Sequence, residues 1–290
     1  MFINPISYPG NKNKLLSQIM ALVPDGVETF VDVFCGSGVV GVNSDAQTIV
    51  ANDISKEALA VLQFFYDNSF KQIVSKIEKI IRKYDLTYSR KQPKGFYVEY
   101  KHEGLSRYNK AGYDRLKQDY NTDGAVDKLV VLLIYGFNHY IRFNKDGVFN
   151  VPVGKVDFSE SIYCAMKDFV EHIKTKTLVF SNKDFRDVSL YNDLKAVYYF
   201  DPPYLITTAP YNQNWQEKDE KDLLQLLDNL DSKGIKFMLS NVLLSNGKEN
   251  TILKKWSRKY TVCPMRRQYR NANYQKVNVT DTIEVLIKNF

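Results

Sequence analysis

The segment Asp201-Pro202-Pro203-Tyr204 combines residue types that suit chemistry on an amine. It follows the apolar run AVYYF (196–200), so a carboxylate, a rigid turn and an aromatic ring come directly after a predicted strand. The two prolines fix φ and remove two N–H donors, which leaves the Asp201 carboxylate and the Pro202 carbonyl as outward-facing acceptors. An exocyclic amine needs such acceptors, and Tyr204 offers a flat face for a base lifted out of a duplex. The alternative is a turn whose aspartate only caps a helix.

A glycine-containing turn is the second candidate for a binding site. Residues 32–38 (DVFCGSG) follow a predicted strand and precede a predicted helix. Gly36 and Gly38 permit a tight turn and the close approach of a ligand to the backbone. Asp53 ends the next strand, where a carboxylate can accept hydrogen bonds from ribose hydroxyls. The turn alone could be an ordinary strand-to-helix connection, but together with Asp53 it favours nucleoside binding.

Short apolar runs predict the scaffold that holds these motifs. Near-continuous apolar character is expected of parallel strands covered by helices on both faces. The predicted strands are residues 28–34, 48–51, 177–180, 196–200 and 235–239, with one more at 282–287. Helical patterns at 56–66 and 217–230 lie between strands, and this alternation predicts an open α/β sheet.

The stretch from about Ser69 to Val156 breaks the alternation and is interpreted as an inserted domain. An amphipathic helix is predicted at 71–82, a polar Lys-, Arg- and Tyr-rich segment at 84–120, and a strongly apolar helix at 126–141. Lysine and arginine outnumber the acids between 71 and 120, a composition that suits nucleic acid. A solvated helical face is the alternative for those charges.

Composition sets broad limits. The 290 residues are 44% hydrophobic, enough for a sizeable core, and the net charge of +7 favours a polyanionic partner. Cys35, Cys164 and Cys263 are widely spaced, so neither a zinc site nor a disulfide framework is expected, and no metal is predicted. The absence of a signal-like N-terminus and of a long apolar run predicts a cytoplasmic protein without a membrane span.

The two motifs together resemble a known family. Asp-Pro-Pro-Tyr with Phe-Cys-Gly-Ser-Gly (34–38) is similar to the amino methyltransferases that modify adenine N6 in DNA. The cofactor motif comes first and the insert lies mid-chain, as in the Dam-like (alpha-group, D12 class) members. Residues 8–12 (YPGNK) match that group's opening motif, although Asn11 stands where the family usually has a second glycine.

Further segments extend this resemblance along the chain. Residues 52–54 (NDI) match the family's acidic cofactor motif, and 138–144 (NHYIRFN) with 147–154 (GVFNVPVG) match its target-recognition hairpin and flank. Arg266-Arg267 and the last strand resemble the family's C-terminal end. Residues 84–120 match no part of the family pattern.

The resemblance implies a fold and a set of residue roles. The fold is a Rossmann-like S-adenosylmethionine-dependent methyltransferase sheet (1–56 and 157–290) with an inserted, mainly helical target-recognition domain (57–156). The implied cofactor-binding residues are Tyr8, Gly10, Lys12, Phe34, Gly36, Gly38, Asp53 and Asp201. The implied catalytic residues are Asp201, Pro202 and Tyr204, and the implied DNA-binding residues are Phe137, Asn138, Arg142 and Pro152. Phe137 and Pro152 could instead belong to the core.

The implied activity is methylation of a flipped adenine in double-stranded DNA, within GATC or a longer site built on GAT. A cognate restriction endonuclease is an implied partner, and the enzyme is expected to be a monomer or a weak dimer. An RNA-adenine or protein-amide methyltransferase is one alternative, but such enzymes often carry Asn at the position of Asp201. A DNA-binding relative that has lost catalysis is another, and the intact motifs argue against it.

Overall fold

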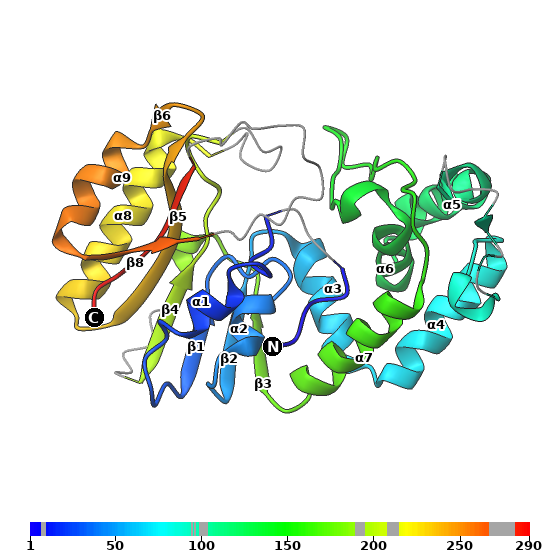
Figure 1. Ribbon diagram of the computed structural model, residues 1–290, viewed down its shortest axis with the longest axis horizontal. Helices are drawn as coiled ribbons and strands as arrows, with labels where there is room; N and C mark the ends of the chain where they lie inside the picture. Colours follow the sequence, from blue (N-terminus) through cyan, green and yellow to red (C-terminus); the bar gives the residue numbers. More distant parts are fainter. Residues whose placement is uncertain are drawn as a thin grey trace.

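The computed structural model describes residues 1–6, 10–93, 95, 97–98, 104–188, 195–207, 215–266 and 282–290. An eight-stranded sheet forms the centre of this part, in the order β3-β2-β1-β4-β5-β8-β7, with β6 paired to β5 (Figure 1). The strands are β1 (Thr29–Asp32), β2 (Thr48–Asn52), β3 (Thr177–Ser181), β4 (Ala196–Phe200), β5 (Lys236–Ser245), β6 (Lys248–Glu249), β7 (Thr261–Met265) and β8 (Ile283–Lys288).

Five strands are parallel, as the sequence predicts. β1 lies between β2 and β4, with Asp32 opposite Ala51 on one side and Tyr199 on the other. The carboxyl ends of these three strands therefore share one edge of the sheet. The predicted last strand is also present, as β8, and it pairs antiparallel with β5 and β7. Strand β7 was not predicted because Pro264 interrupts its sequence, and an outer strand is where a sheet tolerates proline.

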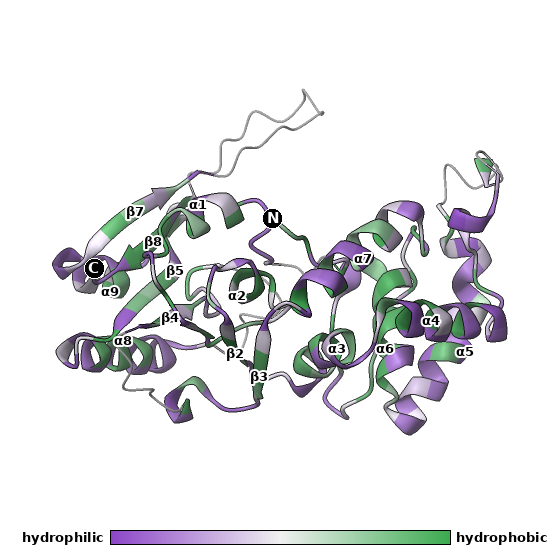
Figure 2. Ribbon diagram, turned by 90° about the horizontal axis from the view of Figure 1, so that it is seen from below, coloured by the Kyte–Doolittle hydropathy of each residue, from purple (hydrophilic) through white to green (hydrophobic). Residues whose placement is uncertain are grey.

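Helices cover both faces of the sheet. They are α1 (Leu16–Met20), α2 (Val39–Asn43), α3 (Lys56–Asp67), α4 (Phe70–Lys83), α5 (Ser106–Asp123), α6 (Val126–Tyr135), α7 (Glu160–Ile173), α8 (Glu217–Ser232) and α9 (Thr251–Trp256). Alternate residues of β4 supply the two cores: Val197 and Tyr199 pack towards α1–α3, and Tyr198 and Phe200 towards α8 and α9. Helices α2 and α8 lie on opposite sides of the sheet in Figure 2. Among the described helices, none is long and apolar enough to cross a membrane.

Helices α4 to α7 gather beyond the β3 end of the sheet (Figure 1). Helix α6 is their centre, since residues 129–135 are all buried and the helix contacts α3, α4 and α5. Ser69 and Gln72 form a capping box that fixes the start of α4 directly after α3. The hydrophobic core on the α1–α3 face continues into these helices, through residues such as Ile73 and Ile77.

The apolar helix predicted at 126–141 is shorter than expected, because α6 ends at Tyr135. Gly136 has an extended backbone and pairs with Val153. A Cβ at Gly136 would lie 2.5 Å from the Leu132 carbonyl oxygen and 2.9 Å from the Tyr113 hydroxyl, so only glycine fits. The predicted end of the helix was wrong because the apolar pattern continues to residue 141, whereas close packing around Gly136 ends the helix at Tyr135.

Candidate active site

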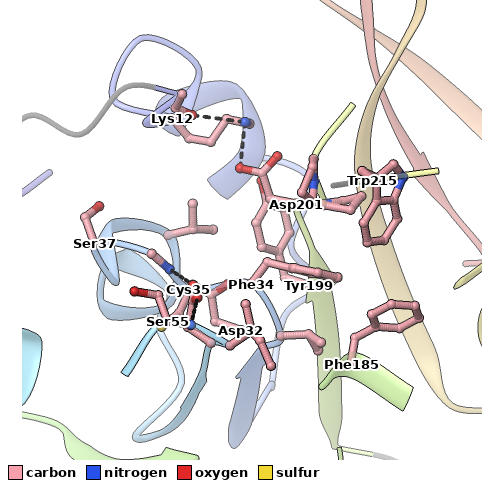
Figure 3. Close-up of a pocket in the computed structure, with 18 of the residues that line it drawn as sticks. Lys12, Asp32, Phe34, Cys35, Ser37, Ser55, Phe185, Tyr199, Asp201 and Trp215 are labelled. Atoms are coloured by element: carbon pink, nitrogen blue, oxygen red, sulfur yellow. Dashed lines mark hydrogen bonds and ion pairs between the residues drawn. The ribbon is translucent and has the colours of Figure 1, made fainter. Parts of the chain in front are cut away.

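The ends of β1, β2 and β4 enclose a cavity of about 560 Å³ (Figure 3). The glycine turn follows β1, Asp53 follows β2 and Asp201 follows β4, so the shared sheet edge brings together motifs that are far apart in sequence. This is the edge at which open α/β sheets bind ligands. The N-terminal segment adds Gly10 and Lys12 to the cavity wall.

The glycine turn is tied to Asp53. The backbone N–H of Gly36 donates to Asp53 Oδ2 at 2.7 Å, and that of Ser55 donates to Oδ1 at 2.8 Å. Burial raises the pKa of Asp53, while these N–H donors oppose the shift. Gly38 has φ of 73°, and a Cβ there would lie 2.6 Å from a methyl carbon of Leu62. The turn therefore needs glycine for both conformation and space.

An ion pair holds the carboxylate of the Asp-Pro-Pro-Tyr segment. Lys12 Nζ lies 2.6 Å from Asp201 Oδ2, and Lys12 is only 3% exposed (Figure 3). Burial raises the pKa of Asp201, and the Lys12 ammonium is the main influence that lowers it. Since the two groups lie within contact distance in a low-dielectric setting, Lys12 favours the ionised form of Asp201.

Tyr204 is locked beside this pair. Its hydroxyl donates to Asp201 Oδ1 at 3.0 Å and also lies 3.3 Å from Glu284 Oε1 on β8. Lys12 Nζ lies 5.2 Å from the centre of the Tyr204 ring, within cation–π distance. Tyr204 is buried and lines the cavity together with Pro202 and Pro203. Both oxygens of Asp201 are thus held in place, which fixes the plane of the carboxylate.

Asp32 is a second buried acid at the cavity. Its Oδ2 accepts from the Gly41 N–H at 3.1 Å, whereas Oδ1 has no hydrogen-bond partner among the described residues. Asp32 is 1% exposed, and burial raises its pKa to about 8. A buried acceptor without a partner is costly, so Oδ1 is suited to a donor on a bound ligand.

Three aromatic rings line another side of the cavity (Figure 3). Phe34 follows β1, Phe185 follows β3 and Trp215 precedes α8. The centre of the Phe34 ring lies 5.6 Å from that of Phe185 and 5.9 Å from that of Trp215, and the last two are 5.5 Å apart. We call these three residues the aromatic wall. Such a surface suits a flat heterocycle.

The residues predicted to bind DNA lie on the loop between α6 and α7. Phe137 and Asn138 belong to the short helical turn Phe137–His139, and the Phe137 N–H donates to the Pro152 carbonyl at 2.9 Å. Phe137 is 49% exposed and Pro152 is also exposed. Neither is a core residue, which removes the alternative that the sequence left open.

Arg142 is held on the same loop by Asn150. Its Nε–H donates to Asn150 Oδ1 at 2.8 Å, and one Nη2–H donates to the Asn150 carbonyl at 3.1 Å. These two bonds occupy the side edge of the guanidinium. The end edge, formed by Nη1 and the second Nη2 hydrogen, is not used by these bonds. Arg142 is exposed.

Several site residues were given no role by sequence reasoning. Glu284 and Trp215 come from elements far from the motifs, and nothing in their local sequence marks them. Phe185 could have been found, because it follows β3 and so belongs to the same sheet edge. Tyr8 and Arg267, which the sequence analysis singled out, lie outside the described residues.

The fold and the site define a class of protein: an open α/β sheet with a nucleoside-sized cavity, a glycine turn and the Asp-Pro-Pro-Tyr segment at one edge. Comparison with known proteins is more specific. Residues 8–271 match the family described as D12 class N6 adenine-specific DNA methyltransferase, and the chain belongs to this family.

Individual relatives are consistent with the family. The chain is 34% identical to the Type II methyltransferase M.FokI of Planomicrobium okeanokoites and 32% identical to the Modification methylase StsI of Streptococcus sanguinis. Each alignment covers 99% of this chain but 43% of the relative, so the chain spans less than half the length of these proteins. It is also 25% identical to a DNA adenine methylase of Salmonella typhi, over 81% of this chain and 79% of that protein.

Proposed function

We propose that the chain is a site-specific DNA methyltransferase that transfers a methyl group from S-adenosylmethionine to the N6 amine of a flipped adenine. The observation that carries this proposal is the Lys12–Asp201 ion pair, in which a lysine favours the ionised form of an acceptor that lines a nucleoside-sized cavity. Family membership supports the reaction type. A relative named DNA adenine methylase supports DNA as the substrate.

The cavity fits the proposed cofactor. S-adenosylmethionine carries an ammonium group whose N–H groups need acceptors, and Asp32 Oδ1 is a buried oxygen without a hydrogen-bond partner among the described residues. Asp53 is placed for the ribose and the aromatic wall for the purine. We propose that the cofactor is held by Tyr8, Gly10, Lys12, Phe34, Gly36, Gly38, Asp53 and Asp201. Bound there, S-adenosylmethionine would supply an electrophilic methyl group.

The role of the protein in the reaction follows from its acceptors. Lys12 favours the ionised form of Asp201, and each carboxylate oxygen retains a lone pair for an N–H of the target amine. The Pro202 carbonyl is the second acceptor, so the amine would be held with its lone pair directed at the methyl group. Positioning and electrostatics then lower the barrier. No covalent nucleophile is needed, and burial raises the pKa of the Cys35 thiol well above its ordinary value, which makes it a poor one.

We propose that residues 57–156 form the DNA target-recognition insert. The exposed Phe137 is suited to wedge into the space that the flipped base leaves, and basic residues offset the unstacking cost through phosphate contacts. The end edge of Arg142 matches guanine O6 and N7, and the exposed Pro152 suits a thymine methyl group. The proposed target is GATC or a longer site built on GAT.

The proposed biological setting is restriction–modification. Two relatives are named modification methylases or type II methyltransferases, and the corresponding partner would be a cognate restriction endonuclease. We propose a monomer or weak dimer acting on double-stranded DNA in the cytoplasm.

The experiment that tests the proposed function uses the purified chain with methyl-labelled S-adenosylmethionine. Plasmid DNA and total RNA are offered as separate substrates, and the labelled nucleosides are identified by mass spectrometry. The expected product is N6-methyladenine in DNA. Label in RNA alone would support the RNA-adenine alternative, and no label with confirmed cofactor binding would support an inactive relative.

A further inference from the structure

Glu220 is a fully buried acid that the proposed mechanism does not use. It is 0% exposed, lies in the first turn of α8 and faces three N–H donors. Trp215 Nε1 donates to Glu220 Oε2 at 2.9 Å, and the side-chain amides of Asn241 and Asn250 donate to Oε1 at 3.2 and 2.9 Å. Burial raises the pKa of Glu220, and the three donors oppose that shift.

The two amide donors cannot exchange their oxygen for their nitrogen. Asn250 Oδ1 accepts from the Leu253 N–H at 3.0 Å, as the cap of α9, and Asn241 Oδ1 accepts from the Val242 N–H at 2.7 Å. Each amide is therefore fixed with its N–H pointing at Glu220. Three fixed donors require an acceptor-only group between them, which is a carboxylate. Glu220 consequently joins β5, α9 and the indole of Trp215 at one point.

The indole held in this way is part of the cavity. Trp215 contacts both Phe34 and Phe185 in the aromatic wall. Phe185 is tied to the same helix through its neighbour Arg186. The Arg186 guanidinium pairs with Asp219 and Asp222 of α8 at 2.6 and 2.8 Å. The orientation of the wall thus depends on two anchors at the start of α8.

We propose that Glu220 is a positioning residue that fixes the Trp215 indole, which meets Phe34 edge-on at an interplanar angle of 78°, so that the aromatic wall keeps its shape for the purine of the adenosyl cofactor. This inference rests on the proposed function for the identity of the ligand. Without the carboxylate, the indole N–H loses its acceptor and the ring is free to turn, so the shape of the wall changes.

The substitution Glu220→Gln tests the proposal because glutamine brings its own N–H₂ among three fixed donors. The single side-chain oxygen of glutamine can accept from the two asparagine amides or from the Trp215 indole, but not from all three donors. We expect binding of S-adenosylhomocysteine, measured by calorimetry, to weaken between about two- and tenfold, the scale of one aromatic contact. KM for the cofactor should rise with little change in kcat.

Asp228 of α8 and Trp256 of α9 provide a control away from the cavity. Trp256 Nε1 donates to Asp228 Oδ1 at 2.8 Å, and Trp256 does not line the cavity. The substitution Asp228→Asn removes the carboxylate partner of an indole, together with its ion pair to Lys259 and its hydrogen bond from the Tyr260 hydroxyl, and it should leave S-adenosylhomocysteine binding unchanged. In a Trp256→Phe background Trp215 is the only tryptophan, so its emission spectrum reports the indole environment directly. Glu220→Gln should shift that emission.

A double-substitution cycle separates positioning from a general loss of stability. Trp215→Phe keeps an aromatic ring but removes the N–H, so adding Glu220→Gln to Trp215→Phe should weaken binding little further. An equal effect of Glu220→Gln with and without the indole would overturn the inference, as would unchanged binding in Glu220→Gln. If wild-type protein binds no S-adenosylhomocysteine, the proposed function fails and the inference fails with it. If Glu220→Gln does not fold, Trp215→Phe tests the inference instead. Normal S-adenosylhomocysteine binding by folded Trp215→Phe would show that binding does not need the indole, which would overturn the inference.

Discussion

The cavity differs in construction from the loop 137–153, which we propose reads the DNA target. In the cavity, Lys12 and Tyr204 are buried and Asp201 is partly buried, and the three hold one another through an ion pair and a hydrogen bond. On the loop, Phe137 and Arg142 are exposed, and Arg142 is held by a near neighbour, Asn150. The chemical step needs a fixed acceptor, whereas reading DNA needs groups that a partner can reach. We therefore expect substitutions in the cavity to change rate and those on the loop to change sequence preference.

Replacing Asp201 should have the largest effect. Asp201→Ala removes the acceptor for the target amine and should lower kcat by at least roughly a hundredfold, by analogy with the removal of one preorganised polar group. The measurement is single-turnover methylation of plasmid DNA. Circular dichroism and thermal melting show whether the variant is folded, and Asp201→Asn is the isosteric control because it keeps the shape but not the charge. Near-normal turnover by folded Asp201→Ala would contradict the proposed mechanism.

Replacing Lys12 should shift the pH dependence of the reaction. Burial already raises the pKa of Asp201, and Lys12→Met removes the ammonium that opposes this shift. In the proposed mechanism the ionised form of Asp201 is the stronger acceptor for the amine, so the acidic limb of the kcat profile should move to higher pH. Activity should fall at neutral pH and recover in part as the pH rises. Lys12→Arg keeps the charge and should move the limb less. An unchanged limb in Lys12→Met would show that Lys12 does not control the ionisation of Asp201.

The cavity and the loop also differ in how well the sequence predicted them. The strand ends, the glycine turn and Asp201 could be predicted because apolar runs mark parallel strands and such strands end at one edge. The partners Glu284 and Trp215 could not, since their positions depend on how β8 and α8 pack against that edge. The end of α6 at Tyr135 was also missed, because it depends on a tertiary contact at Gly136.

On the loop, Arg142→Ala should change specificity more than rate. A bidentate arginine contributes about 1–3 kcal/mol of discrimination against a wrong base, so the variant should accept other bases at the guanine position. Methylation-sensitive sequencing of genomic DNA treated with each protein measures this preference position by position. A phosphate-contacting lysine would behave differently, lowering affinity for all sequences alike. Full discrimination at every position in Arg142→Ala would remove Arg142 as the guanine reader.

The smallest effect is expected for Asn150→Ala. It removes the side-chain acceptor of the Arg142 Nε–H but leaves the Asn150 carbonyl in place, so the guanidinium keeps one of its two bonds. An exposed hydrogen bond is worth about 0.5–1.5 kcal/mol, and discrimination at the guanine position should fall by no more than roughly tenfold. Asn144→Ala is a control on the same loop, since Asn144 Oδ1 accepts only from Asp146 and Val148 backbone N–H groups. If both variants relax the same position equally, loop order rather than the Arg142 contact sets the preference.

The most direct measurement is the methylation pattern that the chain leaves in a host lacking adenine methylation. Genomic DNA is sequenced for N6-methyladenine after expression of wild-type protein and of Asp201→Ala at equal levels. We predict N6-methyladenine in one short motif with a guanine near the modified adenine, and loss of that signal with Asp201→Ala. No N6-methyladenine from soluble, cofactor-binding wild-type protein, or the same pattern from Asp201→Ala, would contradict it.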